Sequence, residues 1–201
     1  MYRAVVWDFD GVVNRSVENG SFLWAENFEE DIGESLEVFE KFLFGRDFGP
    51  VITGSEDVLE RIEDWANQVN FDGDIFAILE YWFKKDTKLD PKILKVMEWV
   101  SQEGAMQAIA TNTDARRAKF IKNNTDFGIR LTEIFASGNI KISKPSTNFF
   151  EYVTKNLDVQ PEEVIFFDDS EKNILAAQQY GWKAVFYCDQ SFDELCTLIR
   201  T

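Results

Sequence analysis

Histidine is absent from this 201-residue sequence, and its absence excludes several kinds of catalytic chemistry. Ser-His-Asp triads, phosphohistidine intermediates and histidine-ligated zinc all require the imidazole ring. Cysteine is scarce: Cys188 and Cys196 have neither metal-type spacing nor a disulfide framework, and neither is followed six positions on by an arginine, as a cysteine-phosphatase loop requires. We expect both thiols to be reduced and structural. The chemistry must then rest on carboxylates, Lys, Thr or Asn.

Positive charge is also scarce, because 21 Lys and Arg residues stand against 36 Asp and Glu residues, for a formal net charge of -15. Such a charge repels nucleic acid and anionic lipid at long range. The apolar run before Asp8 is too short for a signal peptide or a membrane-spanning helix. These features predict a cytoplasmic protein without nucleic acid or a membrane as partner, and leave monomer or homodimer open.

Short apolar runs alternate with helical patterns along most of the chain. The expected strands are residues 4–7, 105–111, 163–168 and 183–187, and the expected helices are 90–104, 114–123, 147–157 and 170–181. Asp90 and Pro91 provide an N-cap and first turn, while Gly104 and Gly181 suit helix ends. Alternation of this kind predicts an α/β fold with a doubly wound, Rossmann-like parallel sheet.

About eighty residues separate the first strand from Asp90, which is too long for a simple connection between a strand and a helix. Apolar residues recur there at helical spacing, and Thr53 to Glu56 could form a capping box. The three expected stripes are Leu36, Phe39 and Leu43; Val58, Ile62, Trp65 and Val69; and Ile75, Phe76, Leu79 and Phe83. The sequence predicts an inserted helical domain at 14–88 and a core domain formed by 1–13 and 89–201.

Four polar clusters lie at or just after predicted strand ends, where open parallel sheets bind ligands. They are Asp8-Phe9-Asp10-Gly11, Thr111-Asn112, Lys144-Pro145 and Asp168-Asp169. Carboxylates gathered at one sheet edge repel one another unless a cation lies among them, and an oxygen-rich site suits Mg²⁺. Lys144, Thr111 and Asn112 could donate to the oxygens of a phosphoryl group. The set is typical of phosphoryl transfer.

These clusters, in this order, resemble the four motifs of the haloacid dehalogenase superfamily. The matching segments are Asp8-Phe9-Asp10-Gly11-Val12-Val13, Ala110-Thr111-Asn112-Thr113, Ser143-Lys144-Pro145 and Phe166-Phe167-Asp168-Asp169-Ser170. The insertion is similar to the α-helical cap of that superfamily, so the resemblance covers essentially the whole chain. Capped relatives of this size resemble sugar-phosphate phosphatases and the epoxide hydrolase N-terminal-like group.

The resemblance implies a role for each residue of the motifs. Asp8 would attack phosphorus to form an aspartyl phosphate, and Asp10 would protonate the leaving alcohol and then activate water. Mg²⁺ would be held by the Asp8 carboxylate, the Asp10 main-chain carbonyl and Asp169, with Asp168 bound directly or through water. The phosphate would be bound by Gly11, Thr111, Asn112 and Lys144, and Lys144 would also balance charge during catalysis.

Several functional readings remain open from the sequence. The first is a phosphomonoester hydrolase acting on a small phosphorylated metabolite, with a sugar phosphate as the best guess. Asp10 favours phosphate esters over the 2-haloacid dehalogenase reaction, whose halide leaving group needs no acid, but it does not separate a hydrolase from a phosphomutase. A non-catalytic phospho-accepting switch would carry its acidic pair first, unlike Asp168 and Asp169, and a silent binding module would have no need of both Asp8 and Asp10.

Five further features of the sequence bear on the core of the insertion or on the site. The aromatic residues of the insertion are expected to form its core rather than a sugar-stacking surface: Phe22, Trp24, Phe39, Phe42, Phe44, Trp65 and Trp82. The stretch 45–54, with Arg46, could be a specificity loop or a plain surface loop. Arg116, Arg117 and Lys119 are expected on a solvated helix face, although they could instead guide an anionic substrate. Asn14 and Arg15 are better candidates for substrate contact, because they lie just past the loop with Asp8. Asn173 stands where many relatives of the superfamily carry an aspartate.

Overall fold

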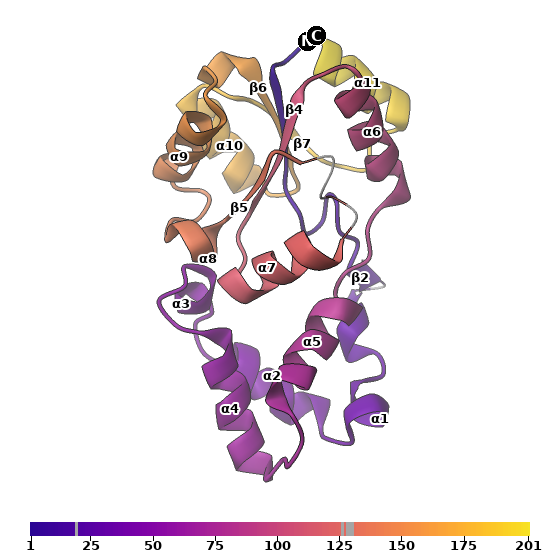
Figure 1. The fold of residues 1–201 in the computed structure, drawn as a ribbon, viewed down its shortest axis with the longest axis vertical. Coiled ribbons are helices and arrows are strands. Elements are labelled where there is room, and N and C mark those ends of the chain that lie inside the picture. Colours follow the sequence, from indigo (N-terminus) through magenta and orange to yellow (C-terminus); the bar gives the residue numbers. More distant parts are fainter. Residues whose placement is uncertain (19, 126, 128–130) are drawn as a thin grey trace.

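The computed structural model describes residues 1–18, 20–125, 127 and 131–201 (Figure 1). A sheet flanked by helices forms one end of the molecule, with both termini at its outer tip, and a group of helices forms the other end. The sheet end is built from the beginning of the chain together with its second half. The helical end is built from the segment between them.

Among the described residues, five parallel strands form the sheet in the order β5-β4-β1-β6-β7. They are β1 (Ala4–Trp7), β4 (Met106–Thr111), β5 (Glu133–Ala136), β6 (Val164–Asp168) and β7 (Lys183–Phe186). The central strand β1 pairs with β4 on one side and β6 on the other, so that Val6 lies opposite Ala108 and Phe166. The carboxyl ends of β1, β4 and β6 therefore meet at one edge.

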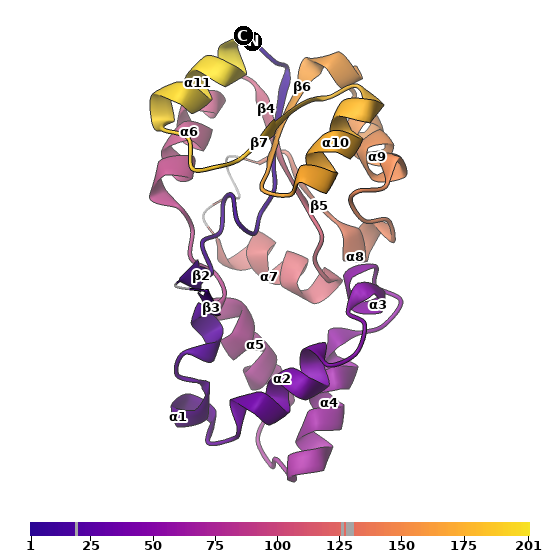
Figure 2. The same ribbon diagram turned by 180° about the vertical axis from the view of Figure 1, so that it is seen from behind.

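Helices cover both faces of this sheet because its central strands are apolar on both sides. Side chains of β1 alternate, so that Val6 joins one cluster of buried residues and Val5 and Trp7 join the other. The first cluster lies under α9 (Thr147–Leu157) and α10 (Glu171–Tyr180), and the second under α6 (Pro91–Gln102) and α11 (Phe192–Arg200), as Figures 1 and 2 show. The predicted doubly wound α/β fold is confirmed.

The predicted strands and helices of the core agree with the structure to within two residues at each end. The sequence interpretation missed β5 at the sheet edge, α11, the single-turn helix α8 (Ser137–Ile140) and the short helix η3 (Pro161–Glu163). Asp90 caps α6 by accepting from the Lys92 amide, and Asp114 caps α7 (Ala115–Asn124) by accepting from the Arg116 and Arg117 amides. Both caps fix helices that begin close to the sheet edge.

The inserted segment packs around a hydrophobic cluster of its own, which includes Trp24, Phe39, Trp65 and Trp82. It comprises a two-residue-strand hairpin, β2 (Val17–Glu18) and β3 (Ser21–Phe22), then η1 (Leu23–Ala25), α1 (Phe28–Ile32), α2 (Leu36–Phe44), α3 (Gly49–Ile52), α4 (Val58–Val69) and α5 (Ile75–Lys85). The three predicted apolar stripes lie on α2, α4 and α5. Phe76 lies on α5 but does not join its buried face, because its side chain is 55% exposed.

The capping box predicted at residues 53–56 is wrong. Helix α4 begins at Val58, and its N-cap is Asp57, which accepts from the Leu59 amide. The Ser55 and Glu56 amides instead donate to the Pro50 carbonyl in the turn after α3. The Glu56 carboxylate pairs with the buried Arg61 at 2.9 Å, so the expected cap partner is used in the core of the insertion.

Two further expectations concern the cysteines and the membrane. Both cysteines are free thiols, with Cys196 buried in the core. Cys188 is exposed. Within the described ranges, no helix combines the length and apolar character that crossing a bilayer requires.

Candidate active site

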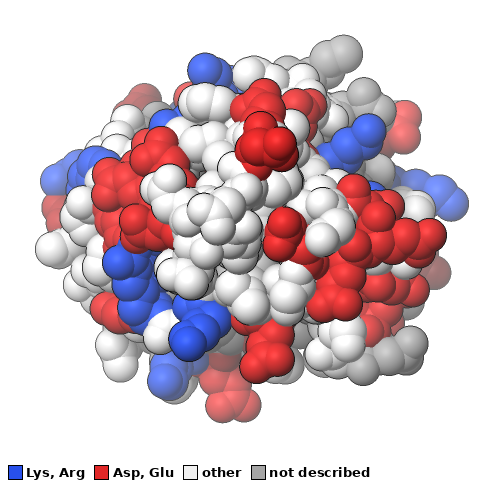
Figure 3. Space-filling view, turned by 90° about the horizontal axis from the view of Figure 1, so that it is seen from below, with Lys and Arg blue, Asp and Glu red and all other residues white. Residues whose placement is uncertain are grey.

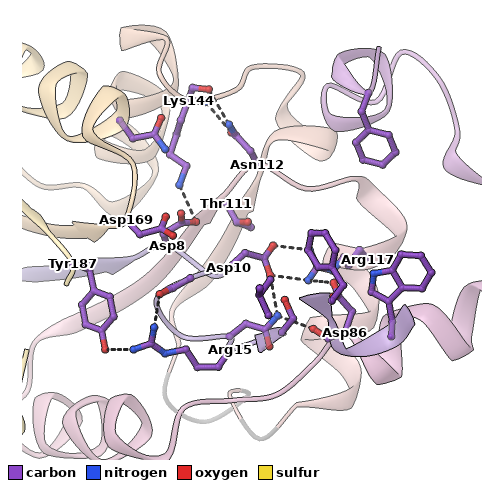
Figure 4. Close-up of a pocket in the computed structure, with 18 of the residues that line it drawn as sticks. Asp8, Asp10, Arg15, Asp86, Thr111, Asn112, Arg117, Lys144, Asp169 and Tyr187 are labelled. Carbon is purple, nitrogen blue, oxygen red and sulfur yellow. Dashed lines mark hydrogen bonds and ion pairs between the residues drawn. The ribbon is translucent and has the colours of Figure 1, made fainter. Parts of the chain in front are cut away.

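Three carboxylates and a lysine meet at the carboxyl ends of β1 and β6. Figure 4 shows Asp8, Asp169 and Lys144 of this group. The Lys144 ammonium lies 2.9 Å from Asp8 Oδ1 and 2.6 Å from Asp168 Oδ2, and its side chain is almost fully buried. Asp8 follows β1 directly, and its amide donates to the Phe167 carbonyl on β6, which continues the sheet ladder to the site. The sequence motifs from distant parts of the chain therefore converge as expected of a parallel sheet.

The three carboxylates, Asp8, Asp168 and Asp169, could hold a metal ion, since one oxygen of each lies within 4.8 Å of the others. Burial raises the pKa of Asp8 to about 8, against the lowering effect of Lys144, and the charge of Asp168 adds to the rise. Burial and Asp168 also raise the pKa of Asp169. The site has an excess of negative charge that a divalent cation would neutralise, and its all-oxygen donor set fits Mg²⁺.

The two neighbouring aspartates differ in their surroundings. Asp168 is fully buried, and its oxygens accept hydrogen bonds from Lys144 and the Ser170 amide. The Asn173 side-chain nitrogen donates to both oxygens, and all of these bonds measure 2.6 to 3.0 Å. Asp169 is exposed toward the cavity. Asn173 therefore orients a carboxylate of the acidic pair.

Gly11 allows the loop after β1 to lie against Asp169. Its φ is +82°, a conformation that residues with a side chain rarely adopt, and a Cβ at this position would lie 2.0 Å from Asp169 Oδ2. The glycine is therefore required by both the backbone conformation and the space. Gly11 therefore lets the loop after β1 pack against the acidic pair.

Thr111 is the last residue of β4, and Asn112 follows it beside this cluster. Thr111 is buried at the cavity wall. The Asn112 side chain exchanges two hydrogen bonds with the main chain of Lys144, donating to its carbonyl at 2.8 Å and accepting from its amide at 2.9 Å. Asn112 therefore fixes the loop that carries Lys144, whose peptide bond to Pro145 is cis.

Arg117 is not part of a solvated helix face, and that expectation is wrong for this residue. Its side chain is only 9% exposed and donates to both oxygens of Asp10, at 2.6 and 2.8 Å. It also lies 2.6 Å from Asp86, just after α5. Arg116 instead pairs with Asp57 on the surface, and Lys119 is exposed.

In this ion-paired cluster the pKa of Asp10 is lowered and the pKa of Asp86 is raised. Burial would raise the pKa of Asp10, but the charge and hydrogen bonds of Arg117 outweigh it and lower that pKa. Burial raises the pKa of Asp86 to about 6, with the charge of Arg117 opposing the rise. Arg117 lies on the same helix face as the buried Ala118 and Ile121, and this spacing was the sequence signal for its burial.

Asn14 and Arg15 lie at the site as predicted, but their polar groups bond to the protein. Buried Asn14 donates to Asp10 at 2.9 Å and to the Asp86 carbonyl at 2.7 Å. Arg15 donates to Asp90 and Asp189 and to the Tyr187 hydroxyl. The sequence interpretation missed Asp86, Tyr187 and Asp189, which come close to the motifs only in the folded chain.

A cavity of about 790 Å³ opens onto these groups between the sheet edge and the inserted helices. Its lining includes Asp8, Asp10, Lys144 and Asp169 together with aromatic side chains of the insertion. Trp24 and Trp82 line it and are also buried in the core of the insertion, so the two interpretations of the aromatic residues are not exclusive. From the stretch 45–54, Phe48 reaches the cavity, whereas Arg46 pairs with Glu56 and Asp64.

The sheet, the motif residues and the inserted helices agree with one family of enzymes. Residues 2–181 match the family of haloacid dehalogenase-like hydrolases. The chain belongs to this family, and it is a hydrolase by that membership.

Among individual proteins, the chain is similar to a phosphorylated carbohydrates phosphatase of Thermotoga maritima, with 25% identity over 92% of this chain and 84% of the relative. Its fold is similar to that of a HAD family enzyme from Bacteroides thetaiotaomicron, solved in complex with magnesium and inorganic phosphate. That match has a TM-score of 0.77, 20% identity, and coverage of 97% and 99% of the two chains. A predicted HAD-like hydrolase from Porphyromonas gingivalis matches with a TM-score of 0.75 and 15% identity, over 100% and 99%.

Proposed function

We propose that this chain is a Mg²⁺-dependent phosphomonoester hydrolase that acts on a small phosphorylated metabolite through an aspartyl phosphate. The observation that carries the proposal is the placement of Lys144 between Asp8 and Asp168, with Asp10 opening onto the same cavity. A phosphorylated sugar is the first candidate substrate, supported by the name of the relative from Thermotoga maritima. A cytoplasmic location stays a prediction.

Asp8 is the nucleophile in this proposal. Its carboxylate attacks phosphorus while the bond to the leaving alcohol breaks, and water then attacks the phosphorus of the aspartyl phosphate and restores Asp8. Lys144 lies 2.9 Å from Asp8 Oδ1, where its charge can stabilise the negative oxygens of the transferred group. Thr111, Asn112 and Gly11 are proposed to bind the phosphate beside it.

Asp10 is the proposed acid and base. The ion pair with Arg117 favours the ionised form of Asp10, which is the form that accepts the proton of the attacking water. The first step needs the protonated form, so the ion pair must loosen before Asp10 can donate to the leaving oxygen. Asp86, 2.6 Å from Arg117, gives the guanidinium a second partner when that happens.

Mg²⁺ would be held by the Asp8 and Asp169 carboxylates and the Asp10 carbonyl. Asp168 is already engaged by Lys144, Ser170 and Asn173, so we assign it the orientation of Lys144 and a contact to the metal through water. When bound, the metal would neutralise phosphate charge during the transfer. We also propose that residues 14–88 form a cap on a core of residues 1–13 and 89–201.

Asp10 separates this proposal from the dehalogenase reaction of the same family. A halide leaves without a proton, whereas an alcohol leaves more easily when a carboxyl group protonates it. Asp10 opens onto the cavity within the same loop as Asp8, as this role requires. A phosphoester substrate therefore explains the residue and a haloacid substrate does not.

Phosphate release from phenyl phosphate by the purified full chain tests the proposal, with chloride release from 2-chloropropionate measured beside it. We expect phosphate release in Mg²⁺, its loss in excess EDTA, its return when Mg²⁺ is restored, and no chloride release. Phosphate release that persists in excess EDTA would contradict the metal-dependent mechanism. Chloride release would favour the dehalogenase reaction instead.

A further inference from the structure

One wall of the cavity is aromatic and is contributed by the insertion alone. This aromatic wall consists of Phe22, Trp24, Phe44, Phe48 and Trp82. The rings are continuous, because Trp82 lies 6.1 Å from Trp24 and 5.8 Å from Phe44 between ring centroids, and Phe44 lies 5.2 Å from Phe48. Whatever is joined to a phosphate held at Asp8 must share the cavity with this surface.

Part of the aromatic wall is exposed rather than buried in the core of the insertion. The exposed large apolar residues of the insertion are Val17, Phe22, Phe44 and Phe76, at 39% to 55% exposure. Three of these four line the cavity, and Phe76 does not. Apolar surface concentrated at a cavity gains free energy when a ligand covers it, which marks a contact surface for the substrate.

The charged groups of the cavity leave little to bind a second anion on the substrate. Among the described lining residues, each cation already has two carboxylate partners within 3.1 Å: Arg15 with Asp90 and Asp189, Arg117 with Asp10 and Asp86, and Lys144 with Asp8 and Asp168. In Figure 3, acidic side chains lie on both sides of an uncharged centre at the outer end of the insertion, with a smaller basic patch on one side. A second anionic group would be repelled without finding an unpaired cation.

We infer, on the basis of the proposed function, that the site selects phosphate monoesters whose leaving group is uncharged and packs an apolar face on the aromatic wall. The ring face of a neutral sugar or an aromatic or alicyclic alcohol meets this description. A phosphate ester with an additional carboxylate or phosphate does not. Phe22 and Phe44 are specificity-determining residues in this inference, because they combine exposure with a place in the wall.

Four esters with alcohol leaving groups separate charge from apolar contact: benzyl phosphate, 4-carboxybenzyl phosphate, 4-(aminomethyl)benzyl phosphate and ethyl phosphate. We expect kcat/KM for the neutral benzyl ester to exceed the values for the anionic and ethyl esters by roughly tenfold or more. Equal or faster turnover of the anionic ester would overturn the inference. A tenfold preference for the cationic ester would also overturn it, since the wall would then select charge.

Variants locate the selectivity. Phe44→Ala and Phe22→Ala should each lower the ratio of benzyl to ethyl kcat/KM, by roughly tenfold for Phe44. Phe76→Ala is the matched control on the same insertion and should leave the ratio unchanged, with circular dichroism checking the fold of each variant. An unchanged ratio in both cavity variants would refute the inference while the hydrolase activity stands. Absence of turnover of every ester would refute the proposed function itself, and the inference with it.

Discussion

At the scale of single residues, two cations in the site each form ion pairs with two carboxylates. Lys144 pairs with Asp8 and Asp168, and Arg117 pairs with Asp10 and Asp86. Both cations are buried, so each pair lies where water screens charge weakly. Loss of either cation would leave buried carboxylates without compensation.

Arg117→Gln and Arg116→Gln compare a buried ion-paired arginine with its exposed neighbour. Removing one partner of a buried pair costs roughly 3–5 kcal/mol of unfolding free energy. The Arg116–Asp57 pair is exposed, at 39% and 41%, and its loss should cost about 1 kcal/mol or less. Urea unfolding measures both, and equal small losses would contradict the structural role assigned to Arg117.

Asp86→Asn tests the pH dependence of stability. Because burial raises the Asp86 pKa to about 6, the folded state holds this proton more tightly than the unfolded state. The contribution of Asp86 is then fully present below pH 4 and is lost as pH rises through about 6, by about 3 kcal/mol in all. Unfolding at pH 4, 5, 6 and 7 should show this decline in the wild type and a flatter profile in Asp86→Asn. Parallel profiles would contradict it.

At the scale of elements, strands that end at the site were predictable because burial makes them continuously apolar. The run Ala4–Trp7 is buried throughout, and the polar residues after it could be placed at the sheet edge. Strand β5 escaped prediction because it is a short edge strand that begins with exposed Glu133. Helix α11 was missed although Ser191 and Glu194 form a capping box, a local signal that the sequence does contain.

The sequence does not show which group compensates the charge of buried Arg117, since its partner Asp10 is 107 residues away. Periodicity puts Arg117 on the apolar face of α7, but the reason that a charge is tolerated there is tertiary. The same holds for Tyr187 and Asp189, which meet Arg15 only in the fold. Motifs were therefore predictable, and the groups that orient them were not.

Gly11→Ala tests the close packing of the β1 loop against Asp169. Its Cβ would lie 2.0 Å from Asp169 Oδ2, so the carboxylate must move. Because Asp169 is a proposed ligand of Mg²⁺, and changes to groups that orient a metal ligand cost roughly 10- to 100-fold in metal affinity or activity, we expect a loss of that size. Gly33→Ala is the control, with a φ of +83° and open space around it. Titration of activity with Mg²⁺ should shift to higher concentration for Gly11→Ala alone. An equal shift in both variants would contradict the packing argument.

At the scale of the whole molecule, the two connections between the insertion and the core run side by side. The Arg15 amide donates to the Lys88 carbonyl at 2.7 Å, and the Asp90 amide donates to the Val13 carbonyl at 2.8 Å. The Asn14 side chain also bonds to the connection that leads back to the core, donating to the Asp86 carbonyl and accepting from the Lys88 amide. These bonds lie at the boundaries proposed for the cap, next to Asp10, so that the position of the insertion and the surroundings of Asp10 are linked.

The central claim is that Asp8 carries the phosphoryl group during turnover. The most direct measurement is mass spectrometry of the peptide containing Asp8 after rapid acid quenching of the enzyme with phenyl phosphate and Mg²⁺, beside Asp8→Asn prepared identically. The account predicts a phosphoryl group on Asp8 in the wild type. In Asp8→Asn it predicts neither a phosphoryl group at this position nor turnover. Turnover that survives in Asp8→Asn, or a phosphoryl group on another residue, would contradict it.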